Sequence, residues 1–358
     1  MDPIELKRTR VVLHKDHVSN VSSIDFPQNF DNGDDDMAWD FEKFKKNFKV
    51  VISSFKKDHL EFDLIGIDAS IANAFRRCLI SEIPTMAIEN VFVLNNNSIV
   101  HDEILSQRLG LVPIKADPRI FQFKTPEDEA TDLNTLVFKM KVKATKRRKF
   151  VTARISESNQ FEQTEFLNDD NFNVLSKHLV WEAQGDQEER LAADPPRPVH
   201  DDIVLAKLRP GQEIDIEVHC QKGIGKEHAK WSPVATASYR LLPDIQILQP
   251  VTGNDAVKFQ KCFSEGVVEV FKNKQGEKEA RIVNPRKDTV SREVLRHKEF
   301  ENKVRLTRIR DHFIFNVEST GILPPHVLFG EAVQVLINKC KRVKEALSEL
   351  TGDMDIDQ

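Results

Sequence analysis

A glycine-rich segment ending in lysine is the first candidate for chemistry, because such loops can bind phosphate. The segment reads GIGK and covers residues 223–226. A complete phosphate-binding loop has a further glycine five residues before the Gly-Lys pair and a serine or threonine after the lysine. Cys220 and Glu227 occupy those two positions. The motif is incomplete, and a tight turn is the better interpretation.

Acidic and histidine residues form the next candidates. The segment DMDID (353–357) has the alternating aspartates by which nucleic acid polymerases hold magnesium, but convergence on one ion needs a rigid loop. The last residues of a chain fray, so a solvated acidic tail is the favoured interpretation. His219 and His228 flank the GIGK turn, where they could serve a hydrolase together with nearby carboxylates or simply form structural hydrogen bonds. Neither a GxSxG nor an HExxH motif is present, although catalytic groups need not be adjacent in sequence.

The cysteines do not have the spacing of a structural metal site. They are Cys78, Cys220, Cys262 and Cys340, and no two of them form a CxxC pair. Structural zinc sites usually take their ligands from closely spaced pairs. We therefore expect no metal, no cofactor and four small thiol side chains that are mostly buried.

A basic run, KATKRRK at residues 143–149, could contact nucleic acid or an acidic partner. No aromatic residues are interleaved to stack on bases, which favours the solvated end of a strand. The whole chain of 358 residues carries 52 basic and 57 acidic side chains, a net charge of −5. This balance does not suggest a chain that wraps nucleic acid by itself.

The composition otherwise indicates a folded protein with room for two domains at about 150 residues per domain. No apolar run reaches the length of about 18 residues that a membrane span needs. The N-terminus lacks the apolar core of a signal peptide. We therefore expect a cytosolic or nuclear protein.

The helix SIANAFRRCLISEIP (70–84) stands out among the elements that would position functional groups. Its apolar spacing predicts a helix from Asp68 or Ser70, either of which could cap it, to Glu82, and Pro84 ends it. Arg76 and Arg77 lie at its centre, and neither has an acidic residue three or four positions away. A strand is predicted before this helix (60–68) and another after it (88–94). The segment 102–114 predicts a short helix that ends at Gly110.

The middle of the chain changes character. Alternating patterns predict strands over 133–145, 203–208 and 212–220, whereas residues 151–202 are polar and resemble an insertion. Residues 223–243 are rich in small residues and predict loops. Further candidate elements are strands at 244–251, 266–271 and 312–319 and a short helix near 289–296.

The last predicted helix runs from Pro324-Pro325 to about Leu350 and carries an apolar stripe. Its members recur every three or four residues, which is the heptad pattern of a helix–helix contact. They are Phe329, Val333, Leu336, Cys340, Val343, Leu347 and Leu350. The stripe fits either packing on the chain's own sheet or an interface with another chain.

Several long motifs together resemble the α-like subunits of cellular RNA polymerases. The region 63–118, with its paired arginines and its second helix ending in GLVP, resembles the α motif. KEHAKWSPVATASYRLLP (226–243) is similar to the signature of the eukaryotic and archaeal larger α-like subunits. LAKLRPGQEI (205–214), RKDTVSREVLR (286–296) and DHFIFNVES (311–319) resemble the larger α-like subunit shared by RNA polymerases I and III.

This resemblance implies an α+β fold with a discontinuous architecture. A tail of residues 1–39, with short local pairing possible, would precede an α-type dimerisation domain made of residues 40–116 and 229–350. An inserted, mainly β domain would cover 117–228, and residues 351–358 would form an acidic tail. The polymerase II counterpart carries clustered zinc-binding cysteines in the insertion. Here that region has only Cys220, which favours the polymerase I and III type and no metal.

The resemblance also implies a role and a set of site residues. The subunit would be non-catalytic and would pair with the smaller α-like subunit. The pair would form a platform for the second-largest polymerase subunit, alongside other subunits of polymerases I and III. Such a subunit works in the nucleus, including the nucleolus, and supports transcription of rRNA, 5S rRNA and tRNA. No membrane contact or direct sequence-specific contact with nucleic acid is expected.

In such a subunit the motif helix and the C-terminal helix form the dimer contact, and the paired arginines, Arg76 and Arg77, face the docked large subunit. The heterodimer residues implied here are Ile71, Ala74, Phe75, Cys78, Leu79, Phe329, Val333, Leu336, Cys340, Val343 and Leu347. Two alternatives stay open: a free-standing nucleic-acid-binding regulator that uses residues 143–149, and a hydrolase that uses His219 and His228.

Overall fold

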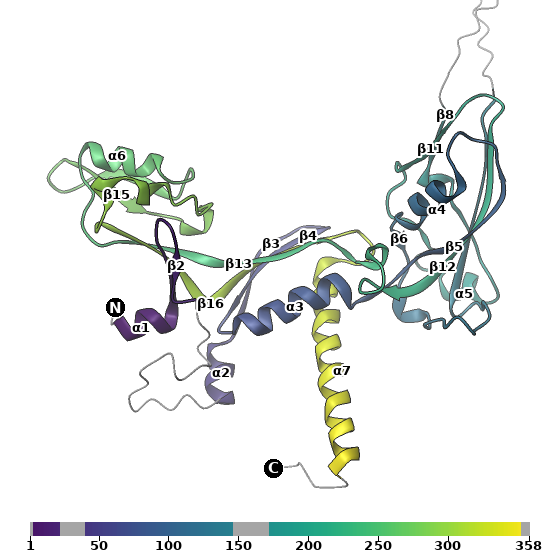
Figure 1. Ribbon diagram of the computed structural model, residues 1–358, viewed down its shortest axis with the longest axis horizontal. Coiled ribbons are helices and arrows are strands. Elements are labelled where there is room, and N and C mark those ends of the chain that lie inside the picture. The colour runs from purple at the N-terminus through teal and green to yellow at the C-terminus, as the bar shows by residue number, and fades with distance from the viewer. Residues whose placement is uncertain (1–2, 22–39, 146–171, 352–358) are drawn as a thin grey trace, which may run out of the picture. The chain divides into compact units, whose positions relative to one another are not determined.

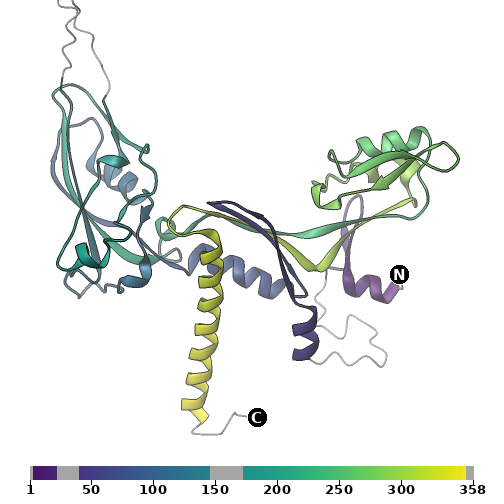
Figure 2. The same cartoon turned by 180° about the vertical axis from the view of Figure 1, so that it is seen from behind.

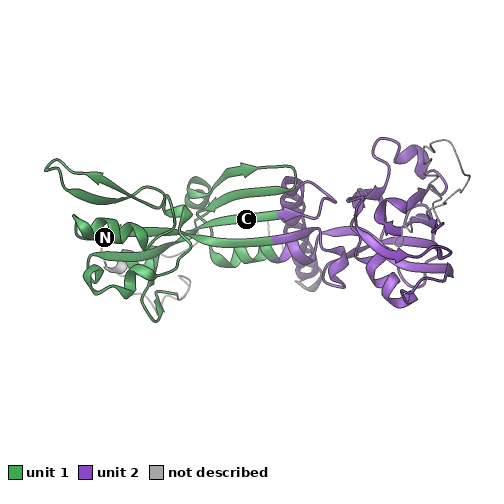
Figure 3. Cartoon of the chain, turned by 90° about the horizontal axis from the view of Figure 1, so that it is seen from above, with its two compact units in different colours: residues 1–76, 237–317 green, residues 77–236, 318–358 purple. Residues whose placement is uncertain are grey.

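The computed structural model describes residues 3–21, 40–145 and 172–351. The chain divides into two compact units, and each unit is built from two separate segments (Figure 3). Unit 1 comprises residues 1–76 and 237–317, and unit 2 comprises residues 77–236 and 318–358. Both units combine helices with antiparallel strand pairs, which agrees with the predicted α+β class. The predicted domain bounds at 40–116, 117–228 and 229–350 stay a prediction.

Unit 1 is organised around a six-stranded sheet within the described residues, with the order β2-β1-β16-β4-β3 and with β13 also paired to β16 (Figure 1). Two of its strands are much longer than the sequence pattern predicts. The strands are β1 (Arg10–Leu13), β2 (Val18–Ser19), β3 (Lys49–Phe55), β4 (His59–Ile65), β13 (Val234–Ile247) and β16 (Val304–Ser319).

Alternating aromatic and aliphatic residues build the core beneath this sheet. Phe62 on β4 stacks on Phe315 of β16 at 5.3 Å between ring centroids. Tyr239 of β13 contacts Phe313 edge-on at 5.4 Å, and both phenylalanine side chains of β16 are fully buried. Offset and edge-on ring pairs add to the stabilisation that the buried apolar area already provides. Leu64 on β4 is also fully buried.

The N-terminal residues form regular structure instead of an entirely unstructured tail. Helix α1 (Pro3–Thr9) leads into the β1–β2 hairpin, and β1 pairs with β16 in the register Val12↔Thr307. The side chains of Val12 and Leu13 are buried, so apolar burial holds this hairpin on the sheet. The short local pairing that the sequence left open is therefore present. The acidic run 31–36 lies outside the described residues, and α2 (Phe41–Asn47) precedes β3.

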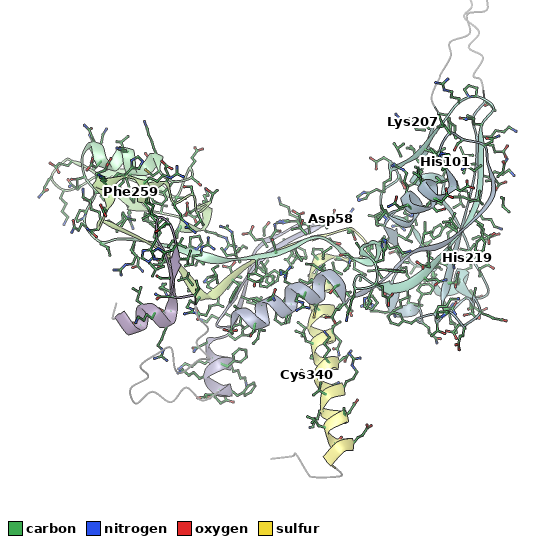
Figure 4. All side chains as sticks on the ribbon, viewed as in Figure 1. Asp58, His101, Lys207, His219, Phe259 and Cys340 are labelled. Carbon is green, nitrogen blue, oxygen red and sulfur yellow. The ribbon has the colours of Figure 1, made fainter. Side chains whose placement is uncertain are left out.

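A small subdomain of unit 1 contains a helix that the sequence pattern did not indicate. Helix α6 (Asn254–Lys261) packs against the pair β14 (Val268–Lys272) and β15 (Lys278–Ile282). Phe259, labelled in Figure 4, is fully buried between Phe263 and Phe300. Short 3₁₀ turns follow at Pro285–Lys287, Glu293–Arg296 and Lys298–Phe300. The middle one replaces the helix predicted near 289–296.

Helix α3 (Ala69–Ser81) matches the predicted helix to within a residue. Asp68 caps it: its Oδ1 accepts the Ser70 N–H at 2.8 Å, and its carbonyl accepts the Ala72 N–H. Burial opposes ionisation of Asp68, but the hydrogen bonds from Ser70 outweigh it and lower the pKa of the carboxyl. Such a cap satisfies backbone donors that a helix end leaves unpaired. The boundary between the two units falls within this helix, after Arg76.

Unit 2 is built on a four-stranded sheet in its described part, with the order β5-β12-β7-β9. Helix α4 (Asp102–Gly110) buries Leu105 and Leu109 in the core of this sheet, and it ends at the predicted Gly110. The larger elements are β5 (Pro84–Asn96), β7 (Thr135–Lys143), β9 (Val180–Glu182), β11 (Val204–Leu208) and β12 (Glu213–Ile224). The shorter ones are β6 (Ile114–Lys115), β8 (Phe172–Leu175), α5 (Gln187–Arg190) and β10 (Arg197–Pro198).

The region predicted as loops, 223–243, is only partly a loop. Its second half belongs to β13, so that prediction was wrong from Val234 onward. Its buried positions, among them Val234 and Ala237, do not follow the two-residue period of a strand, so the sequence pattern gave no strand signal here. The tight turn at GIGK is present: the Glu227 N–H bonds the Ile224 carbonyl at 3.0 Å.

The two glycines of GIGK serve close packing. A Cβ on Gly223 would lie 2.4 Å from the Trp231 ring, and one on Gly225 would lie 2.5 Å from the Ile80 carbonyl oxygen. Both distances are far below van der Waals contact, so only glycine allows this approach. The glycines therefore have a structural explanation that does not involve phosphate.

The polar stretch 151–202 is described only from residue 172 onward, where short strands and turns replace the featureless insertion. Most of the basic run (146–149) and the aspartates at 353–357 lie outside the described residues. The final helix, α7 (Pro325–Thr351), agrees with the predicted one. It has 27 residues and a length of about 40 Å at 1.5 Å per residue.

Candidate subunit interface

The apolar stripe of α7 changes from buried to exposed along the helix. Near the start of the helix, Leu328 and Ala332 are fully buried, and Phe329, Val333 and Leu336 are half-buried. Every described side chain from 341 to 349 is exposed, and Figures 1 and 2 both draw this half of the helix projecting. An apolar stripe that its own chain covers only at the start is typical of an interface.

Three members of the stripe lie on the projecting half. Cys340, labelled in Figure 4, is exposed, Val343 is 61% exposed and Leu347 is 48% exposed. They continue the heptad spacing of the covered half. Ile337, beside the stripe, is also exposed.

Charged contacts within unit 2 hold the first half of α7 in place. Lys339 Nζ donates to Glu82 Oε1 at 2.6 Å, and Arg119 Nη1 lies 3.6 Å from Glu331 Oε1. Beside them lies a cavity of about 210 Å³, and Lys222 is part of its lining. Burial lowers the pKa of this lysine. These contacts fix the direction in which α7 leaves the unit.

The five α3 residues predicted for the interface differ in exposure. Cys78 and Leu79 are 2% and 0% exposed, so their side chains already pack within this chain. Ile71 is exposed, and Ala74 and Phe75 are half-buried. Burial, reinforced by Glu82, raises the pKa of the Cys78 thiol and keeps it protonated. The exposed part of this face is therefore centred on Ile71.

The paired arginines of α3 have different environments. The half-buried Arg76 donates through Nε and Nη2 to Asn73 Oδ1 at 3.1 and 3.0 Å, so it has a neutral partner one turn earlier. Arg77 is exposed, and within the described residues its side chain makes no hydrogen bond or ion pair. Neither guanidinium is neutralised by a carboxylate in the described part of the chain.

The histidines proposed for a hydrolase have structural partners. His219 Nε2 lies 3.0 Å from Glu217 Oε1, and its ring contacts Phe92 edge-on at 4.7 Å. His228 Nδ1 accepts the Lys230 N–H at 3.1 Å and caps a 3₁₀ turn. Across the described ranges, no group of three or more His, Cys, Asp or Glu side chains is arranged to hold a metal ion.

The structure adds two features that were not among the predicted site residues. The edge strand β3 exposes apolar side chains on both faces, namely Val50, Val51, Ile52 and Phe55. The apolar run in FKVVISSF was the available signal, although exposure on both faces cannot be read from it. Arg286 reaches Asp63 at 2.7 Å and Glu61 at 2.6 Å, partners more than 220 residues away in sequence.

Membrane insertion finds no support in the described helices, since none of them is both long enough and apolar enough to cross a bilayer.

Comparison with known proteins places the chain in a family. The RNA polymerase Rpb3/Rpb11 dimerisation domain family matches residues 61–340. The chain is 52% identical over 351 residues to the Bos taurus "DNA-directed RNA polymerases I and III subunit RPAC1", covering 98% of both chains. It is 47% identical to the Saccharomyces cerevisiae subunit of the same name, covering 93% of this chain and 97% of the relative.

A polymerase II subunit is more distant. The Dictyostelium discoideum "DNA-directed RNA polymerase II subunit rpb3" is 30% identical, covering 86% of this chain and 94% of the relative. This ranking agrees with the motifs at 205–214, 286–296 and 311–319. The chain therefore belongs to the RNA polymerase Rpb3/Rpb11 dimerisation domain family, and within it to the larger α-like subunits of the polymerase I and III type.

Proposed function

We propose that this protein is a non-catalytic assembly subunit of RNA polymerases I and III, which pairs with the smaller α-like subunit. The observation that carries the proposal is the exposed apolar half of α7, with Val343 and Leu347 at heptad spacing, in a chain of the dimerisation family. Obligate interfaces bury about 2,000 Å² or more and are rich in apolar side chains. The projecting helix supplies such a surface for a partner helix.

The remainder of the interface would come from Ile71, Ala74 and Phe75 on α3 and the half-buried Phe329, Val333 and Leu336 on α7. Cys78 and Leu79 would then act indirectly, by supporting the α3 face from the core. Cys340 would be the first member of the seam on its exposed half.

The arginine pair would serve a third subunit. Arg77 is exposed and Arg76 binds only a neutral amide, so no carboxylate of the described residues pairs with either guanidinium. A guanidinium binds a carboxylate through two parallel hydrogen bonds, and this suits it to protein interfaces. We place the second-largest polymerase subunit there, with its acidic side chains opposite Arg76 and Arg77.

A non-catalytic role is supported by the structural partners of His219 and His228, which leave the hydrolase alternative without an assembled site. The nucleic-acid alternative has weak support too. Lys139, Lys141 and Lys143, which lead to the basic run, each pair with an acidic residue on a neighbouring strand. Membership of polymerases I and III would place the protein in the nucleus, including the nucleolus, in support of rRNA, 5S rRNA and tRNA transcription.

Co-expression tests the proposal. Alone, the chain should aggregate or elute as a broad peak in gel filtration because its seam is exposed. With the smaller α-like subunit it should elute as a 1:1 heterodimer. A well-behaved monomer that ignores the co-expressed subunit would contradict the proposal.

The docking role of the arginines has its own test. The Arg76→Ala/Arg77→Ala variant should form the heterodimer normally but capture less of the second-largest subunit in a pull-down. Full capture by this variant would remove the docking role and leave the heterodimer intact.

A further inference from the structure

Arg308 of unit 1 lies near two other arginines and Asp288, and none of the three arginines forms an ion pair within the described residues. Arg240 lies on β13, Arg308 on β16 and Arg292 in the loop before a 3₁₀ turn. Burial is the largest cause that lowers the pKa of Arg308. The nearby positive charges of Arg292 and Arg240 lower it further. Asp288 is the acid that offsets this repulsion.

The hydrogen bonds of this cluster go to backbone carbonyls. Arg240 donates to the carbonyls of Arg286 at 2.8 Å and Asp288 at 3.3 Å, and Arg292 donates to the carbonyl of His14 at 3.3 Å. Arg308 Nε is buried and has no hydrogen-bond partner. Within the described ranges, no carboxylate oxygen lies within ion-pair distance of these three guanidiniums. Buried donors are normally satisfied, so an orphaned guanidinium nitrogen points to a group that completes it.

The neighbouring Arg286 shows what a structural arginine looks like in this fold. It donates two hydrogen bonds to Asp63 at 2.7 Å and two to Glu61 at 3.1 and 2.6 Å. Its charge is therefore fully balanced inside unit 1. Arg240 and Arg292 donate to backbone carbonyls instead, and none of the three, Arg308 included, pairs with a carboxylate of the described residues.

The loop that carries the cluster is strained. Val290 and Arg292 have φ of +59° and +57°, in the left-handed region that non-glycine residues rarely occupy. For a β-branched residue such as Val290 this conformation is unusual, and it costs free energy that the surrounding contacts must offset. Both strained residues follow the buried Asp288, on the loop that carries Arg292. Strain of this kind is common where a chain presents groups to a ligand or partner.

We propose that Arg240, Arg292 and Arg308 form a docking site for an acidic segment of a partner protein, whose carboxylates complete the cluster. Two carboxylates would balance the three guanidiniums and Asp288. Arg240 is exposed, so a partner can reach the site from solvent. Arg292 and Arg308 are half-buried, so their charges are partly desolvated. Charge-assisted hydrogen bonds are strongest in such partly desolvated sites.

A protein partner fits this cluster better than nucleic acid does. Asp288 lies near Arg308 and Arg240, so the positive charge is confined to a small centre that suits one or two carboxylates better than a run of phosphates. Planar guanidinium forks on fixed strands match discrete carboxylates in both geometry and number. The site uses neither α3 nor α7, so it is separate from the proposed heterodimer and large-subunit contacts.

Binding of a labelled oligoglutamate peptide to the full-length chain, followed by fluorescence anisotropy at low salt, tests the proposal. The variant Arg240→Gln/Arg292→Gln/Arg308→Gln should bind at least about tenfold more weakly, because each charged hydrogen bond it loses is stronger than a neutral one. The matched control Lys278→Gln/Arg281→Gln/Arg296→Gln removes the same charge from exposed positions of unit 1 and should bind nearly as well as the parent.

Two further readouts guard against misfolding and a wrong partner class. The exposed Arg240→Gln alone should weaken binding about threefold. Arg308→Gln should not lower the melting temperature, because it removes an unpaired, desolvated charge.

An equal loss of binding in the control variant would overturn the proposed site. So would a lower melting temperature for Arg308→Gln with unchanged binding. Tighter binding of an oligothymidylate that depends on the same arginines would replace the acidic protein segment with nucleic acid and contradict the proposal.

Discussion

Single residues of unit 1 show how its two distant segments are joined. Arg286 forms ion pairs with Asp63 and Glu61, and His312 Nε2 lies 2.8 Å from Asp63 Oδ2. Asp63 is itself buried. A buried carboxylate needs partners, so Arg286 compensates for the desolvation of this acid.

Arg286→Gln should therefore destabilise the chain by about 2–4 kcal/mol, since it leaves a buried carboxylate with less compensation. Urea unfolding monitored by tryptophan fluorescence would measure this change. The control Arg296→Gln removes an exposed guanidinium that pairs only with Glu293, and it should cost less than about 1 kcal/mol. Equal effects of the two changes would contradict the structural role of Arg286.

Asp288 predicts a pH dependence. Burial raises the pKa of its carboxyl above the ordinary value of 3.8, despite backbone hydrogen bonds and nearby arginines that lower it. A raised pKa means that the folded state favours the protonated acid, so this residue's contribution is present at low pH and is lost as pH rises through the folded pKa. At neutral pH the ionised carboxylate opposes folding.

Asp288→Asn should consequently be more stable than the parent at pH 7, and this advantage should disappear as the pH falls toward 3. Asparagine keeps an oxygen acceptor for the loop, so the comparison isolates the charge. Denaturant unfolding of both proteins across this pH range measures the difference. An advantage that grows toward low pH would reverse the assigned sign.

Among the elements, α7 carries the clearest function. Its first half is fixed by Leu328, Ala332 and the Lys339–Glu82 ion pair, so its second half projects in a defined direction. Preorganised surfaces lose less entropy on binding than disordered segments do. If α7 binds the proposed partner, its exposed half would therefore lose little entropy on binding.

Val343→Asp should disrupt the heterodimer without unfolding the chain, because Val343 is exposed in the chain by itself. Placing a charge in an apolar interface core costs several kcal/mol, enough for at least about a hundredfold loss of affinity. Gel filtration of the co-expressed pair would reveal the loss. The control Ser348→Asp introduces the same charge beside the seam and should leave the heterodimer at normal yield; failure of both variants, or of neither, would place the seam elsewhere.

The elements differ in how far the sequence could predict them. Helix α3 was predictable because Asp68, a regular apolar stripe and Pro84 all mark its bounds, and α7 was predictable for the same kind of reason. Strand β13 was not, since its buried positions from Val234 onward do not alternate with exposed ones. Helix α6 has only eight residues and a core held by Phe259, so its folding depends on contacts with β14 and β15.

The candidate site was predictable only in part. Heptad spacing indicated the α7 seam, but it could not show where the chain's own packing ends, near Leu336. Ile71, Cys78 and Leu79 share one helix face, but only Ile71 is exposed, and the sequence could not show this difference. The arginine cluster combines Arg240, Arg292 and Arg308 from three separate segments, and no local sequence pattern predicts that they lie close together.

At the scale of the whole molecule, the chain joins two units, each made of segments far apart in sequence. We propose contact roles for four of its surfaces: the α7 seam, the arginines of α3, the β3 edge and the arginine cluster of unit 1. Together with full-length relatives named for polymerases I and III, these surfaces indicate a protein whose work is to hold other subunits.

Affinity purification of a tagged copy from its own cells, followed by mass spectrometry, tests this account most directly. The account predicts near-stoichiometric recovery of the smaller α-like subunit together with the large subunits of both polymerase I and polymerase III. Recovery of the chain without polymerase subunits, or with polymerase II subunits alone, would contradict it.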